Sequence, residues 1–130
     1  MKTYKDIYKL PLRKAKYGSW VYDSNSNFVF QFETKYDETG NYLFGWKEFE
    51  NRVLDCINGI SPLVTQSDTV FTLNEGDIFI IQSGIKSHII TIRGWGNLTG
   101  IGAHNLPGDE AANIQDTFAE FIIKQLNNND

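Results

Sequence analysis

Two hairpin patterns, each followed by an amphipathic helical pattern, constrain the fold of this chain more than any other feature of its sequence. Residues 19–23 and 28–32 are rich in aromatic and β-branched side chains, and the four residues between them favour turns. A second pair of β-rich runs covers residues 77–82 and 87–93, and residues 69–73 form another run before it. The pattern predicts two β-hairpins, each with a four-residue turn, and one further strand.

A helical pattern follows each hairpin. Apolar residues recur at spacings of three and four between residues 46 and 57, which places them on one face of a helix. Gly59 favours a left-handed end to this helix. Pro107, Asp109 and Glu110 favour the start of a second helix, because the free N–H groups and the dipole there favour negative charge. The predicted buried stripes are Trp46, Phe49, Val53, Leu54 and Ile57 in the first helix, and Ala111, Ile114, Phe118, Phe121, Ile122 and Gln125 in the second.

This order of elements predicts an α+β fold. We expect a single domain over residues 1–130, with an antiparallel sheet of about five to six strands and both helices on one face, in two layers. A shift of 69 residues aligns the two helical patterns and pairs Asn58 with Asn127. The chain is therefore a candidate duplication, with half-repeats 17–60 and 69–127 of hairpin plus helix. The alternative is that any two amphipathic helices ending in asparagine would align this well.

Alternation along the strands predicts which side chains are buried. Phe28, Phe30 and Phe32 fall on one face of their strand, and three phenylalanines on one face predict contact with the core. His88 falls on the same face as Ile90, which favours a buried, hydrogen-bonded histidine over a functional one.

The net charge of −4 hides an uneven distribution. Residues 1–16 contain six Lys or Arg and one Asp, a net +5, so the other residues carry −9. The overall charge disfavours broad binding to nucleic acid, because neutralising phosphates needs a surplus of Lys and Arg. The basic arm, with Tyr4 and Tyr8 between its cations, could grip a nucleic-acid backbone. The favoured interpretation is that it folds over an acidic surface of the same or another subunit.

The single cysteine and the N-terminal sequence bear on compartment. Cys56 has no second cysteine to pair with, and its place in a helical pattern predicts a small buried hydrophobic residue. The N-terminus has no apolar run of signal-peptide length, and the longest apolar stretch is too short to span a bilayer. We expect a protein of the cytoplasm that has no membrane partner.

Motifs of common enzyme and cofactor sites are missing from the sequence. The chain has no P-loop, no His-Glu-x-x-His, no Gly-x-Ser-x-Gly and no Cys-x-x-Cys. With His88, His104 and one cysteine, a structural zinc site would need carboxylates among its ligands, which is uncommon. We therefore expect a protein that is not an enzyme and that holds no metal and no cofactor.

Residues 93–105 form the candidate ligand-binding segment. Four glycines in nine residues leave backbone N–H groups uncovered. Arg93 could bind a phosphate with two hydrogen bonds, and Trp95 could stack on a base. The alternative is structural: a bulged, Gly-rich strand whose tryptophan packs in the core or against a second copy. The candidate binding residues are Arg93, Trp95, Asn97, Thr99, His104 and Asn105.

Several stretches carry a resemblance to known proteins. They are Leu-Pro-Leu at 10–12, Trp-Val-Tyr-Asp at 20–23, Arg-Gly-Trp-Gly at 93–96, Asp-Glu-Ala-Ala at 109–112 and Phe-Ala-Glu-Phe-Ile at 118–122. In these stretches the chain resembles small bacteriophage and prophage proteins, including those of gut bacteria related to Bacteroides. The resemblance implies no catalytic residue. It implies that the chain inhibits or sequesters a component of host defence, or serves DNA metabolism.

Three hypotheses for function follow. In the first, a homo-oligomeric binding protein in the bacterial host cytoplasm acts as a sponge, and residues 93–105 hold a nucleotide-derived defence signal without turnover. In the second, the protein is an inhibitor of a host defence nuclease, of anti-CRISPR or anti-restriction type, that uses its acidic surface. In the third, it is a structural or accessory phage protein that only oligomerises.

Overall fold

The computed structural model describes residues 2–16, 18–33, 46–92, 106 and 108–127. Within these residues, six strands form one antiparallel sheet in the order β1-β2-β3-β6-β5-β4. In chain order, the elements are α1 (Tyr4–Ile7), β1 (Arg13–Lys14), β2 (Trp20–Tyr22), β3 (Phe28–Phe32), α2 (Trp46–Ile57), β4 (Val70–Asn74), β5 (Asp77–Gln82), β6 (Ile85–Thr91) and α3 (Gly108–Asn127).

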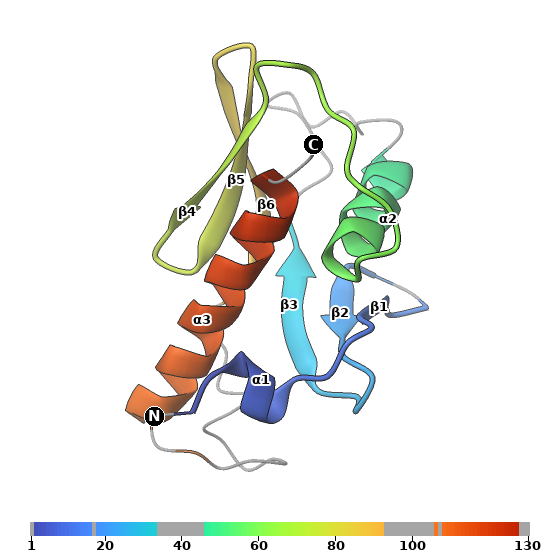
Figure 1. The fold of residues 1–130 in the computed structure, drawn as a ribbon. Coiled ribbons are helices and arrows are strands. Elements are labelled where there is room, and N and C mark those ends of the chain that lie inside the picture. Colours follow the sequence, from blue (N-terminus) through green and yellow to red (C-terminus); the bar gives the residue numbers. More distant parts are fainter. Residues whose placement is uncertain (1, 17, 34–45, 93–105, 107, 128–130) are drawn as a thin grey trace.

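Helices α2 and α3 lie on one face of the sheet (Figure 1). Their buried side chains and those of the strands form one hydrophobic cluster. The predicted α+β class with an antiparallel sheet is confirmed, and the short elements α1 and β1 were not predicted. The largest fully buried apolar side chains are Phe30, Ile57, Leu63, Ile78, Ile89, Ile90, Ile114, Phe118, Ile122 and Leu126.

Two tight turns close the β4–β5 and β5–β6 hairpins. Glu75 and Gly76 have φ of 50° and 86°, and Ser83 and Gly84 have φ of 51° and 78°. Positive φ at both central residues is the geometry of a two-residue hairpin turn that matches the twist of the strands. The four-residue turn expected in the β5–β6 hairpin is therefore wrong, because β6 already begins at Ile85.

A bulge in β3 reverses the predicted alternation. Val21 pairs with Phe30 but Tyr22 pairs with Phe28, so Val29 has no partner opposite it. Val29 and Phe30 are consecutive and both buried, while Phe28 is half-buried on the face of Tyr22. The prediction that Phe28 faces the core is wrong. The extra residue at Val29 places Phe28, before the bulge, and Phe30, after it, on opposite faces of the sheet.

A matching bulge lies in β6. Ile78 pairs with Ile90 and Phe79 pairs with His88, which leaves Ile89 without an opposite residue. Ile89 and Ile90 are both fully buried, and His88 lies with Phe79 on the face away from the helices. The prediction of a buried His88 on the face of Ile90 is therefore wrong for the same physical reason.

The sequence pattern predicts the helix positions well, but three of the described residues in the predicted buried stripes are exceptions. Gly59 ends α2 with φ of 75°, and the N–H of Ile60 donates to the carbonyl of Asp55. These are features of a Schellman end. The predicted burial is wrong, however, for Phe49 in α2 and for Phe121 and Gln125 in α3, which are only half-buried. The side chain of Trp46 lies outside the described part of the structure.

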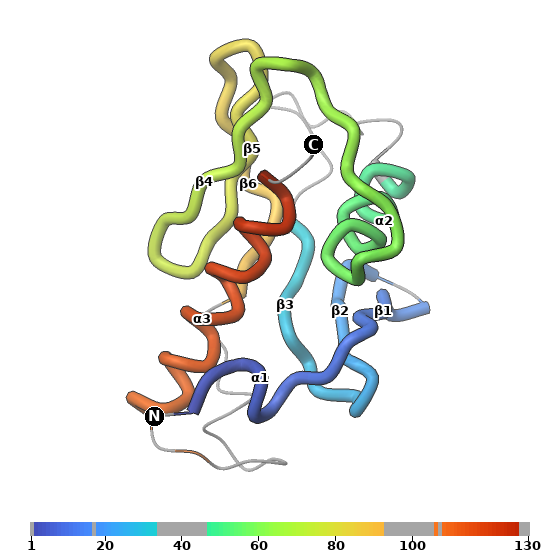
Figure 2. The backbone as a smooth tube through the Cα atoms, in the orientation of Figure 1, coloured from blue at the N-terminus to red at the C-terminus, as the bar shows by residue number. Residues whose placement is uncertain are grey.

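The basic arm lies along this chain's own body, from the foot of α3 to the edge strand β1 (Figure 2). The amide of Tyr4 donates to Thr117 Oγ1 at 3.0 Å. Lys14 Nζ makes an ion pair of 2.8 Å with Glu50, a carboxylate that is only 1% exposed. Tyr8 is buried. One cation of the arm, Lys14, thus contacts an acidic side chain of the same chain. That the arm as a whole covers an acidic surface stays a prediction.

The strand order is symmetric about the centre of the sheet: three consecutive strands lie on each side, and the third strand of each set lies at the centre (Figure 1). Each three-stranded half, β1-β2-β3 or β4-β5-β6, is followed by one long helix. The halves meet where Gln31 of β3 pairs with Thr91 of β6. The bulges at Val29 and Ile89 occupy the corresponding strands of the two halves. This arrangement supports the duplication hypothesis, which stays a prediction.

Two asparagines at the ends of the long helices clamp the edge strands in the same way. Asn58 accepts from the amide of Leu12 at 2.7 Å and donates to its carbonyl at 3.0 Å. Asn127 accepts from the amide of Phe71 at 3.1 Å and donates to its carbonyl at 3.0 Å. These are the asparagines that the 69-residue shift pairs, so both halves attach helix to strand by the same contact.

We expect Asn58→Ala and Asn127→Ala each to lower the free energy of unfolding by about 1–3 kcal/mol, because both leave buried backbone groups without partners. Urea unfolding followed by circular dichroism measures the loss. The control is Asn51→Ala on the exposed side of α2, for which we expect a change within about 0.5 kcal/mol. Equal stability of Asn127→Ala and the control would contradict the clamp.

Candidate functional site

The six residues predicted to bind a ligand lie outside the described residues: Arg93, Trp95, Asn97, Thr99, His104 and Asn105. The strand that leads to them is described. β6 ends at Thr91, and the amide of Ile92 donates to the carbonyl of Gly76 at 3.0 Å. The described strand that precedes the candidate segment, β6, lies at the centre of the sheet. The described residues around Thr91 are therefore the candidate for a site.

Four side chains form a row across the sheet on the face away from α2 and α3. Trp20 pairs with Gln31, Gln31 with Thr91, and Thr91 with Asp77. We call these residues of β2, β3, β6 and β5 the cross-strand row. Neighbouring strands lie about 4.8 Å apart, so the backbones of Trp20 and Thr91 are about 10 Å apart. The indole of Trp20 is 54% exposed, although tryptophan is one of the largest apolar side chains.

A hydrogen-bond network joins the polar end of the row. Thr91 Oγ1 donates to Glu33 Oε1 at 2.6 Å, and Gln31 Nε2 donates to the same oxygen at 3.5 Å. His88 Nε2 lies 3.1 Å from Thr91 Oγ1 and 3.5 Å from Asp77 Oδ1. Glu33 and Asp77 thus bracket the hydroxyl and the imidazole, and all five side chains are half-buried.

The surroundings of His88 fix which ring nitrogen carries the proton. Nε2 lies near the carbonyl of Ile90 at 3.1 Å, Thr91 Oγ1 and Asp77 Oδ1. Because the proton of Thr91 goes to Glu33, all three oxygens act as acceptors towards Nε2. The neutral ring therefore carries its proton on Nε2 and presents Nδ1 as an acceptor.

An aromatic stack holds the other side of His88. Its ring stacks on Phe79 with centroids 4.8 Å apart and planes at 27°. The ammonium of Lys86 lies 4.5 Å from the centroid of the Phe79 ring, a cation–π distance. One half of the open face is therefore polar and carries a cation next to the network.

The corresponding positions in the other half are aromatic. Trp20 and Tyr22 lie edge-on to Phe28, with centroids 6.1 and 5.9 Å away. The guanidinium of Arg13 lies 5.5 Å from the centroid of Tyr22. On the core side, the buried strand residues of both halves are apolar. On the open side the two halves differ: Trp20 of β2 and Asp77 of β5 occupy the same place in their halves, but one is aromatic and the other is acidic.

Sequence reasoning missed Trp20, Gln31, Glu33 and Asp77 as site residues. They lie in three different segments, with Gln31 and Glu33 in or directly after the same strand, and only strand pairing brings the segments together. One signal was present: Ile89-Ile90 is a doubled apolar pair inside an alternating strand, and such a pair favours a bulge.

Other features bear on the chemistry available. Among the described residues, no group of three or more His, Cys, Asp and Glu side chains is arranged to hold a metal ion. Cys56 is buried, as predicted, and its Sγ donates to the carbonyl of Gln125 at 3.3 Å. In the part of the chain that is described, no helix is both long and apolar enough to cross a bilayer. The chain matches no protein-family model, no curated protein and no solved structure.

Proposed function

We propose that this protein is a binding protein that holds a nucleoside-containing ligand on the open face of its sheet and does not transform it. The observation that carries the proposal is the cross-strand row, which sets an exposed indole two strands from a hydroxyl, carboxylate and imidazole network. The distance of about 10 Å along the row suits a ligand with a flat group at one end and hydroxyls at the other.

The chemistry of the row supports a base and a sugar as those two parts. An indole face stacks on any base, and such stacking is worth about 1–3 kcal/mol. Carboxylates accept hydrogen bonds and repel phosphate, so Glu33 and Asp77 suit sugar hydroxyls. A phosphate would lie beyond them, towards Lys86, whose ammonium lies over the ring of Phe79.

The hydrogen-bond network favours binding of a ligand over catalysis. The proton of Thr91 is directed to Glu33 and the Nε2 proton of His88 to three oxygens, so these groups fix each other in place. A nucleophile needs a base directed at it and donors for the developing charge, and this geometry supports a set of fixed acceptors instead. The phage resemblance makes nucleotide-derived defence signals the ligands to test first.

The acidic-surface inhibitor is less well supported. The exposed carboxylates of the described residues are spread over five segments: Asp6 on α1, Glu48 on α2, Asp68 before β4, Glu75 in the β4–β5 turn, and Asp109 and Glu120 on α3. Mimicry of nucleic acid needs acids gathered on one face. Homo-oligomerisation, the basis of the third hypothesis, stays a prediction.

Calorimetric titration of the full chain with 3′,5′-cyclic AMP, cyclic di-AMP and ADP-ribose tests the proposal. We expect at least one to bind with a dissociation constant below 1 mM, and chromatography to recover it unchanged after long incubation. Trp20→Ala should weaken binding at least about tenfold, because a stacking face is lost. Thr91→Val should weaken it too, because the variant keeps the shape and loses the hydroxyl.

Ile60→Ala is the matched control, since Ile60 is an exposed apolar residue in the loop after α2. It should bind as the parent chain does. Binding weaker than millimolar by every probe, or a converted ligand, would overturn the proposal. Equal binding by Trp20→Ala and Ile60→Ala would move the site away from the cross-strand row.

A further inference from the structure

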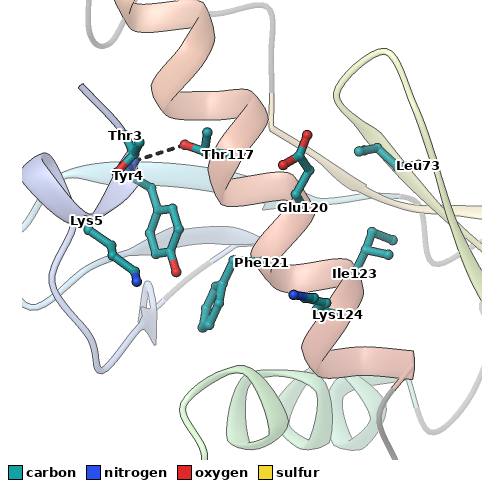
Figure 3. A pocket seen from close by; sticks show the side chains of 9 residues that line it. All are labelled: Thr3, Tyr4, Lys5, Leu73, Thr117, Glu120, Phe121, Ile123 and Lys124. Atoms are coloured by element: carbon teal, nitrogen blue, oxygen red, sulfur yellow. Dashed lines mark hydrogen bonds between the residues drawn. The ribbon is translucent and has the colours of Figure 1, made fainter. Parts of the chain in front are cut away.

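A groove lies on the helical side of the molecule, apart from the cross-strand row. It runs between α1, the second half of α3 and the end of β4, with a cavity volume of about 550 Å³ (Figure 3). Small-molecule sites in proteins usually have volumes of about 300–1,000 Å³. Tyr4, Leu73, Phe121 and Ile123 give the groove its apolar wall.

The aromatic part of this wall is held in place by the fold. The rings of Tyr4 and Phe121 stack with centroids 5.0 Å apart and planes at 25°. The amide of Tyr4 donates to Thr117 Oγ1 at 3.0 Å, and this hydroxyl donates to the carbonyl of Asn113 at 2.8 Å. The groove is therefore formed before any ligand enters, which lowers the entropic cost of binding.

Two apolar side chains that line this groove, Phe121 of α3 and Leu73 of β4, are only partly buried. Phe121 belongs to the predicted buried stripe of α3, but it is only half-buried and faces the groove. Leu73, at the other side, is 38% exposed although its strand partner Ile78 is fully buried. Phe121 packs against the core on one side, and both it and Leu73 keep exposed apolar surface towards the groove. This surface favours an apolar ligand group.

Two cations lie beside the aromatic pair. Lys5 of α1 and Lys124 of α3 are exposed and extend on either side of Tyr4 and Phe121 (Figure 3). Within the described part of the chain, neither lysine makes an ion pair or a side-chain hydrogen bond. Glu120 lies on the other side of the groove, towards Leu73. The charge pattern therefore favours an anionic group at the aromatic end of the groove, which the two lysines flank.

The hydroxyl of Tyr4 adds a donor at that end. Burial raises the pKa of Tyr4 above its ordinary value, which further favours the protonated phenol that can donate a hydrogen bond. Figure 3 shows the hydroxyl directed towards the side on which Lys5 lies. Two ammonium groups and a phenol beside an apolar wall match a carboxylate that carries an apolar tail.

We infer that this groove binds an amphiphilic carboxylate. Its alkyl or aryl part lies against Tyr4, Phe121 and Leu73, and its carboxylate lies between Lys5 and Lys124. The binding needs no metal, no covalent step and no second copy of the chain. It is independent of the ligand proposed for the cross-strand row, which lies on the opposite face of the sheet from the long helices.

Decanoate, kept below its micelle concentration, is the probe, and decyltrimethylammonium is its charge-reversed counterpart. Calorimetry on the full chain should show one decanoate site with a dissociation constant of about 100 μM or lower. Decyltrimethylammonium should bind at least tenfold more weakly, because its cation meets two lysines. Equal affinity of the two probes would overturn the inference, since binding would then be only hydrophobic.

The double variant Lys5→Gln with Lys124→Gln should weaken decanoate binding about tenfold or more. Lys9→Gln with Lys47→Gln is the matched control, because it removes two exposed lysines and the same charge elsewhere. Leu73→Gln, a change at an exposed strand end, should also weaken binding and tests the apolar wall independently. Equal affinities of the two double variants would overturn the inference. Trp20→Ala should bind decanoate unchanged, which separates this site from the nucleoside site.

Discussion

Replacing Phe118 with alanine should lower the free energy of unfolding by about 3–5 kcal/mol. Phe118 is fully buried in α3, and its ring is the meeting point of four others. The centroids of Tyr8, Tyr4, Phe121 and Phe30 lie 4.9, 5.5, 6.3 and 6.4 Å from its own. Removal leaves a cavity between α3, the basic arm and the sheet, and the loss of the four aromatic pairs contributes to the same total.

The matched control is Phe121→Ala, the same change one turn further along α3. Phe121 is half-buried beside the groove, so we expect less than half the loss found for Phe118→Ala. Urea unfolding measures both, and near-ultraviolet circular dichroism reports the aromatic packing. A domain of this size has only about 5–15 kcal/mol of stability. Should Phe118→Ala fail to fold, Phe118→Leu gives the smaller, measurable step. A loss for Phe118 variants no larger than for Phe121→Ala would contradict a central role for this ring.

The elements of this fold could be predicted because their signals are local. The strand propensities of residues 28–32 and 77–82 and the helical spacing from Phe49 to Ile57 each lie within one segment. Hairpin turns and helix order then limit the topology to an antiparallel sheet with helices on one face. The two-residue strand β1 gave no such signal, because it is specified by contacts with β2 and Asn58.

The candidate site could not be predicted, because it depends on two bulges and on pairing between distant strands. A single extra residue at Val29 or Ile89 decides whether Phe28 and His88 face the core or the open side. Periodicity describes regular strands, and a bulge is a departure from regularity. Trp20 and Thr91 also lie close together only because β3 of one half pairs with β6 of the other half at the centre of the sheet.

Asp23 shows how one buried carboxylate can organise a turn and dock a distant segment. It is fully buried, and it accepts four hydrogen bonds. The amides of Asn25 and Asn27 donate to Oδ1 at 3.0 and 2.8 Å, within the β2–β3 turn. The amide of Lys9 and the side chain of Asn27 donate to Oδ2 at 2.8 and 3.1 Å. One side chain therefore fixes both the hairpin and the position of the basic arm.

We expect Asp23→Ala to lower the free energy of unfolding by at least about 3 kcal/mol, because hydrogen bonds to a carboxylate contribute about 1.5–3 kcal/mol each and all four are lost. Trypsin should also cleave after Lys9 faster than in the parent chain, because the arm loses its anchor. Asp23→Asn keeps Oδ1 and should lose less.

The matched control is Asp68→Ala. Asp68 is an exposed carboxylate that accepts one hydrogen bond, from the amide of Ser83, at 2.8 Å. For the control we expect a loss of about 1 kcal/mol or less. If Asp23→Ala lost no more stability than Asp68→Ala, the hairpin and the arm would have to be held by their other contacts, such as the bonds between Leu12 and Asn58 and the buried ring of Tyr8.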